Sequence, residues 1–76
     1  MAGYNDQQRR AYNGGVEESD KWYDLGLPKP SNALIVEMAF NWCAIHIEVP
    51  CSVQERESYA ACYINGFLEH REKALA

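Results

Sequence analysis

The chain has 76 residues, of which 47% are hydrophobic, and its 7 Lys and Arg against 11 Asp and Glu give a formal net charge of −4 at pH 7. This length allows one domain whose core is only marginally sufficient alone, so we expect self-association, most simply as a homodimer. The acidic balance argues against binding to the phosphate backbone of nucleic acids, which requires clustered basic residues.

The cysteines and the N-terminus indicate a reducing compartment. Three cysteines, Cys43, Cys51 and Cys62, cannot all pair within one chain. The first residues lack the charged and apolar regions of a signal peptide. We therefore expect a cytoplasmic protein that does not associate with membranes and keeps its thiols reduced.

Residues 6–25 are predicted to form the first helix, after a frayed terminus at 1–5. Asp6 is the expected N-cap, and Gly26 followed by Pro28 marks the end of the helix. Helical spacing places one set of residues on a single side: Tyr12, Gly15, Val16, Ser19 and Tyr23. The pattern predicts an amphipathic helix that packs through this side.

A pair of glycines, Gly14 and Gly15, interrupts this helix. Each interior glycine costs about 1 kcal/mol relative to alanine, so the helix either breaks there or uses the glycines to let another backbone approach. We favour a continuous or kinked helix, because Gly15 lies on the packing side. The Tyr12-x-x-Gly15 spacing recurs as Tyr63-x-x-Gly66.

Residues 32–49 are predicted to form a central, buried helix capped by Ser31 or Asn32. Its plainly polar positions from residue 33 onward are few: Glu37, Asn41, His46 and Glu48. A helix that is apolar nearly all round is normally buried, and this one is too short and too polar to span a bilayer. The alternation at 45–49 also fits a strand paired between subunits.

Residues 53–75 are predicted to form the third helix. Pro50 ends the preceding helix, and Ser52 with Glu55 forms a capping box, so the short connection predicts an αα-hairpin. The expected core side of the third helix is apolar: Val53, Ala60, Ile64, Phe67, Leu68 and Leu75. The fold class is therefore all-α, a small domain of three helices.

A flanking face of the third helix combines small and aromatic residues. Its members are the interface candidates: Tyr59, Cys62, Tyr63, Gly66 and His70. This composition is typical of protein interfaces and predicts that the face contacts another chain. A core contact on two sides of the helix gives the same pattern.

Residues that could carry chemistry do not form a recognisable site. His46 is expected to point toward the core, where a buried imidazole needs a hydrogen-bond partner. Cys43-x2-His46 resembles half of a zinc site, but Cys51 and Cys62 lack the paired spacing of zinc ligands. We expect no metal and no cofactor.

Enzymatic activity and DNA reading are also not expected. Cys51 precedes a helix start that could lower the pKa of its thiol, but the sequence offers it no orienting group and no oxyanion donors. We therefore assign no catalytic residue. The short connection at 50–52 fits a helix-turn-helix, but the next helix begins with one cation among carboxylates, which phosphates repel.

The sequence therefore predicts a non-enzymatic interaction protein that binds and modulates or inhibits another protein. Phage-encoded inhibitors of host enzymes or defence systems, acting in the host cytoplasm, are of this kind. The alternative is a protein that binds a nucleotide or metabolite in an aromatic pocket. The pocket candidates are Trp22, Tyr23, Trp42 and His46.

Overall fold

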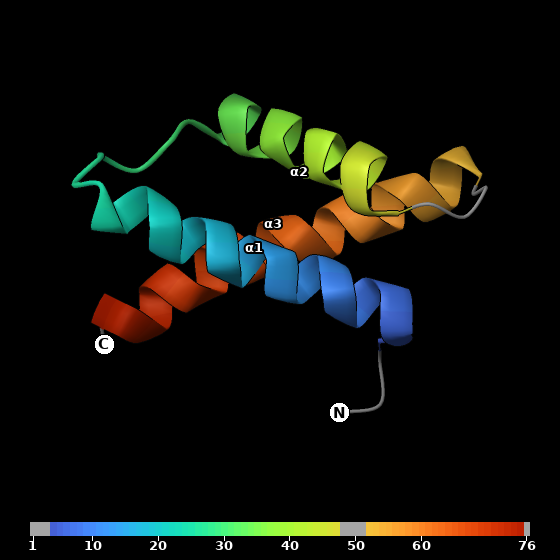
Figure 1. The fold of residues 1–76 in the computed structure, drawn as a ribbon, viewed down its shortest axis with the longest axis horizontal. Coiled ribbons are helices and arrows are strands. Elements are labelled where there is room, and N and C mark those ends of the chain that lie inside the picture. The colour runs from blue at the N-terminus through green and yellow to red at the C-terminus, as the bar shows by residue number, and fades with distance from the viewer. Residues whose placement is uncertain (1–3, 48–51, 76) are drawn as a thin grey trace.

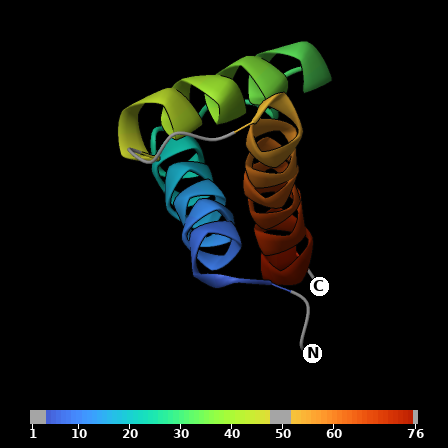
Figure 2. The ribbon, with the colours of Figure 1, turned by 90° about the vertical axis from the view of Figure 1, so that its right-hand side faces the viewer.

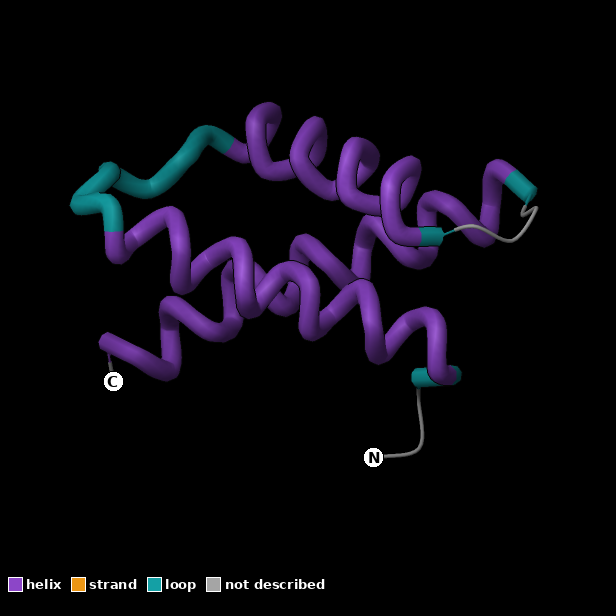
Figure 3. The backbone as a smooth tube through the Cα atoms, viewed as in Figure 1, coloured by secondary structure: helices purple, strands orange, loops and turns teal. Residues whose placement is uncertain are grey.

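The computed structural model describes residues 4–47 and 52–75, and side chains as far as residue 69. Three helices make up this part of the chain: α1 (Asp6–Asp24), α2 (Asn32–His46) and α3 (Val53–Leu75). The predicted all-α class is confirmed, since the described residues are helices joined by loops (Figure 3). The alternative strand is absent from 45–47, the part of its segment that is described.

Polar side chains cap the starts of α1 and α2. Asn5 Oδ1 accepts a hydrogen bond from Gln8 N at 2.8 Å, and Gln8 Oε1 accepts one from Asn5 N at 2.9 Å. This reciprocal capping box makes Asn5 the N-cap, so the prediction of Asp6 was wrong by one position. At α2, Ser31 Oγ accepts a hydrogen bond from Leu34 N at 3.2 Å, as expected of a serine cap.

The connection from α2 to α3 has the predicted cap, but α2 is shorter than predicted. Ser52 Oγ accepts from Glu55 N, and Glu55 Oε1 accepts from Ser52 N, both at 3.1 Å. α2 ends at His46 rather than at residue 49, because Ile47 turns to extended geometry with φ −97° and ψ 97°. β-Branched side chains favour that conformation. Residues 48–51 lie outside the described part of the chain.

α1 runs through its glycine pair without a break and meets α3 there. A Cβ on Gly15 would collide with the backbone carbonyl of Tyr63, and a Cβ on Gly66 would collide with that of Tyr12. The contact is therefore reciprocal: each glycine receives the carbonyl of the other helix's tyrosine. The repeated Tyr-x-x-Gly spacing is what allows both backbones to approach so closely.

α1 and α3 run in the same direction, as the colours of Figure 1 show. Side chains join the pair along its length. Gln8 Nε2 donates to Ser58 Oγ at 2.9 Å, and the Tyr12 hydroxyl donates to Glu69 Oε2 at 2.6 Å. Tyr23 packs against Phe67 with ring centroids 6.1 Å apart. α1 and α3 thus form one closely packed layer.

α2 covers this layer from one side (Figure 2). It packs chiefly on α3, and its buried residues are only Ile35, Ala39 and Cys43. The prediction that 32–49 forms the central helix was therefore wrong. α1 and α3 approach each other through glycines, which leaves no space between them for a third helix.

Candidate functional site: an apolar helix face and the adjoining pocket

α2 presents apolar side chains to the surface. Its buried residues recur every fourth position, so one stripe of the helix meets the core and the remaining apolar residues stay outside. Four large ones are exposed: Leu34 at 36%, Val36 at 41%, Phe40 at 37% and Ile45 at 71%. We call these four residues the α2 outer face.

Few charges interrupt the α2 outer face. At 100° per residue, Leu34 and Ile45 lie along one margin and Val36 and Phe40 along the other. Glu37, Asn41 and Ala44 are exposed between the margins, and α2 contains neither Lys nor Arg. Large apolar side chains gathered on one exposed helix mark interaction sites more often than isolated ones do.

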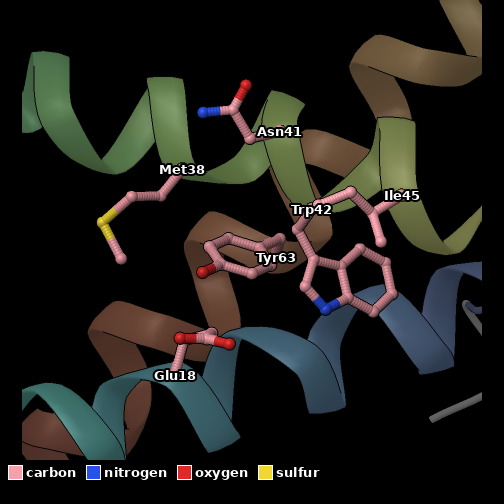
Figure 4. A pocket seen from close by; sticks show the side chains of 6 residues that line it. All are labelled: Glu18, Met38, Asn41, Trp42, Ile45 and Tyr63. Atoms are coloured by element: carbon pink, nitrogen blue, oxygen red, sulfur yellow. The ribbon is translucent and has the colours of Figure 1, made fainter.

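A pocket of about 210 Å³ opens between α2 and α1. Its lining residues are Glu18 from α1, Met38, Asn41, Trp42 and Ile45 from α2, and Tyr63 from α3. Figure 4 shows the Glu18 carboxylate rising from α1 toward Tyr63, while the amide of Asn41 points outward. We call this cavity the α1–α2 pocket.

Trp42 forms the best-supported wall of the α1–α2 pocket. Its indole lies over Gly14, where a Cβ would come within 2.5 Å of Trp42 Cε2. Its ring stacks on His46 with centroids 4.6 Å apart and contacts Tyr63 at 5.9 Å. The two adjacent glycines of α1 therefore serve different neighbours: Gly14 an indole, and Gly15 a backbone.

The polar groups of the α1–α2 pocket include one carboxylate and one neutral phenol. Burial, and to a lesser extent the nearby Glu18 carboxylate, raise the pKa of Tyr63 well above its usual range, so its hydroxyl stays protonated at neutral pH. No described residue that lines the pocket carries a positive charge. The pocket thus offers acceptor oxygens beside apolar walls.

The predicted interface on α3 is a contact within the chain. Tyr59, Cys62 and Tyr63 are buried, and Gly66 meets the backbone of α1. Burial raises the pKa of the Cys62 thiol, although a hydrogen bond with Tyr4 partly lowers it. In this structure these four residues therefore belong to the core contact on two sides of the helix, the alternative that gives the same pattern as an interface. The side chain of His70 lies outside the described side chains.

The core side predicted for α3 is confirmed in the middle of the helix and wrong at its first residue. Ala60 and Phe67 are buried, and Ile64 and Leu68 pack against the core. Val53 is 73% exposed, because it lies in the first turn of the helix and outside the core cluster. The side chain of residue 75 is not among those described.

The four ligand-pocket candidates contact different neighbours in the structure. The Trp22 indole N–H donates to the Pro28 carbonyl at 2.7 Å, and Tyr23 packs on α3. Of the four pocket candidates, only Trp42 lines the α1–α2 pocket. Its volume is below the ~300–1,000 Å³ typical of small-molecule pockets, so it suits a single side chain better than a nucleotide.

His46 is exposed, contrary to the prediction that it points into the core. His46 lies on the side of α2 that faces the core, but it is the last residue of the helix, and no neighbouring helix of the described chain covers it there. The thiols of Cys43 and Cys62 are buried, whereas Cys51 is outside the described residues. Within the described part of the chain, no group of three or more His, Cys, Asp or Glu side chains could hold a metal ion.

The comparisons with known proteins add no assignment to this geometry. No protein-family model, curated protein or solved structure matches the chain. Among the described residues, no helix has the length and apolar character needed to cross a membrane.

Two features of the site were missed by sequence reasoning. The α2 outer face was hidden by the assumption that a helix apolar on all sides is buried on all sides. Glu18 was not singled out, because a carboxylate on an acidic helix has no distinguishing spacing. The glycine pair could have indicated the arrangement from sequence. Two adjacent residues of a helix point to different faces, so a glycine at each position predicts that α1 has two close neighbours.

Proposed function

We propose that this protein is a non-enzymatic interaction protein that binds and modulates another protein through the α2 outer face. The observation that carries the proposal is the exposure of four large apolar side chains on one helix. Burying such side chains contributes about 25 cal/mol per Å² of apolar surface, which is the usual source of affinity at the centre of an interface.

A different protein fits the α2 outer face better than a second copy of this chain. A two-fold contact centred on this face would bring two Glu37 carboxylates into one apolar interface. Neither copy of α2 offers a Lys or Arg to pair with them. Each chain also carries a formal charge of −4, so two copies repel at long range.

The test is affinity capture from cell extract with the wild-type chain and two variants. Val36→Ser/Phe40→Ser removes one margin of the α2 outer face without touching the core cluster. Leu25→Ser is the matched control, since it removes a 74% exposed apolar side chain beyond the end of α1. Circular dichroism and native mass spectrometry check the folding and oligomeric state of all three proteins.

We expect one protein to be retained by the wild type and by Leu25→Ser and to be lost by the double variant. With that protein purified, removing two partly exposed apolar anchors should cost about 2 kcal/mol of binding free energy, roughly 30-fold in Kd. Equal affinity of the double variant would refute the assignment. A wild-type homodimer that the double variant dissociates would assign the face to self-association instead.

A further inference from the structure

We propose that the α1–α2 pocket receives one lysine or arginine side chain of the partner protein. This inference rests on the proposed function and specifies the chemistry of the partner. The pocket combines a carboxylate on the α1 side with apolar walls on the α2 side, and the polar and apolar parts of a long basic side chain match these two sides.

The apolar walls suit the alkyl stem of such a side chain. Met38, Trp42 and Ile45 extend from α2 over the cavity, whose 210 Å³ holds one side chain rather than a larger ligand. Lysine and arginine bury their methylene groups along apolar surface while their charged ends reach polar groups. A flexible methionine beside a fixed indole lets the wall adapt to either stem.

The opposite side of the pocket suits the cationic end. Glu18 is partly buried, and none of the described side chains that line the pocket is basic and could pair with its carboxylate. The Tyr63 hydroxyl adds a neutral acceptor, and the rings of Trp42 and Tyr63 attract a cation through their π faces. A partner's ammonium or guanidinium group would supply the positive charge that these groups lack.

The position of the pocket connects it to the α2 outer face. Ile45 belongs to both, so a protein that covers the face has its edge at the mouth of the pocket. The partner surface is therefore expected to be apolar with a basic side chain at its margin. Its positive charge also complements the net charge of −4, which speeds association.

The pocket can be tested on the full chain without the partner. In the ¹H–¹⁵N NMR spectrum, the two tryptophans give two indole N–H signals, which a Trp22→Phe variant assigns. The chain is titrated with n-butylguanidinium and n-butylammonium chloride, which copy the two side chains. Sodium butyrate and 1-butanol have stems of similar length with an anionic or a neutral end.

We expect both cations to shift the Trp42 indole signal saturably, with a Kd on the order of 1–10 mM, the range open to ligands of this size. Glu18→Gln, which keeps the shape but removes the charge, should weaken both at least fivefold. Glu17→Gln changes an exposed neighbour and should leave them unchanged. Thermal melts of both variants confirm that they are folded.

Three results would overturn the inference: no saturable shift with either cation, an equal shift with butyrate or 1-butanol, or unchanged cation binding in Glu18→Gln. Each can occur while Val36→Ser/Phe40→Ser still loses the captured protein, in which case the proposed function stands and the pocket assignment fails. If the cations bind but that double variant fully retains the captured protein, the pocket assignment stands and the proposed function fails.

Discussion

Replacing Gly15 with alanine is expected to force α1 and α3 apart. A Cβ at this position would lie 2.9 Å from the backbone nitrogen of Phe67 and nearer still to the carbonyl oxygen of Tyr63. Ordinary contacts begin at 3.4 Å, so 0.5 Å is a lower bound on the displacement. Both obstructing atoms belong to the backbone of α3 and cannot rotate away.

The magnitude follows from two opposing effects. Overpacking a close-packed contact costs typically 1–3 kcal/mol, and a backbone obstacle places this site near the upper end. Alanine recovers about 1 kcal/mol of helix propensity relative to glycine. The net expectation is a loss of about 2 kcal/mol of unfolding free energy, which lowers Tm by about 10 °C in a domain of this size.

Thermal and urea unfolding followed by circular dichroism measure this loss. Asn13→Ala is the matched control, because it makes a helix-favouring change at an exposed position of the same helix. It should be neutral or slightly stabilising. If Gly15→Ala were as stable as the control, the close backbone contact would be refuted, and the glycine pair would have to mark a break in α1.

Two further predictions concern polar groups of the α1–α3 layer. Ser19→Ala should raise the unfolding free energy by about 1 kcal/mol, because the buried Ser19 hydroxyl has no hydrogen-bond partner among the described residues. Alanine also has the higher helix propensity. If urea unfolding showed the variant to be less stable, the hydroxyl would have to be hydrogen-bonded. The hydrogen bond to Glu69, followed by burial, raises the pKa of Tyr12 from 10.0 to about 12. The protonated Tyr12 hydroxyl therefore contributes its full stabilisation below pH 10, and this stabilisation is lost between about pH 10 and 12. The urea midpoint of the wild type should fall across that window, and that of Tyr12→Phe should fall less. An equal fall in both proteins would assign the loss of stability to other titrating groups.

The helices and most of their ends could be predicted from local chemistry. The Ser52 capping box and the stop at Gly26, which has a φ of 75°, act within a few residues, so the sequence contains the whole signal. The packing side of α1 was also predicted correctly: Gly15 and Ser19 are buried, and Tyr12 is half-buried. These features depend on single helices and not on how the helices are arranged.

The arrangement of the helices could not be predicted in the same way. Hydrophobicity made the most apolar helix the best candidate for the centre, but the centre is set by how closely two backbones approach. Tyr63 and Gly66 look like an interface for the same reason that they form the core contact: small and aromatic residues suit any close helix pair. The candidate site was missed as a consequence. It lies on the exposed side of α2, the helix that was predicted to be central and buried.

The pairing of α1 with α3 determines when the core can form. Gly15 must meet Tyr63 across a long stretch of chain, so the decisive contacts close a long loop, which slows folding relative to helical bundles built from neighbouring segments. During synthesis, α1 and α2 are made before α3, whose backbone packs against Gly15. Stable structure therefore waits for α3, and the three helices fold as one unit once α3 has been translated.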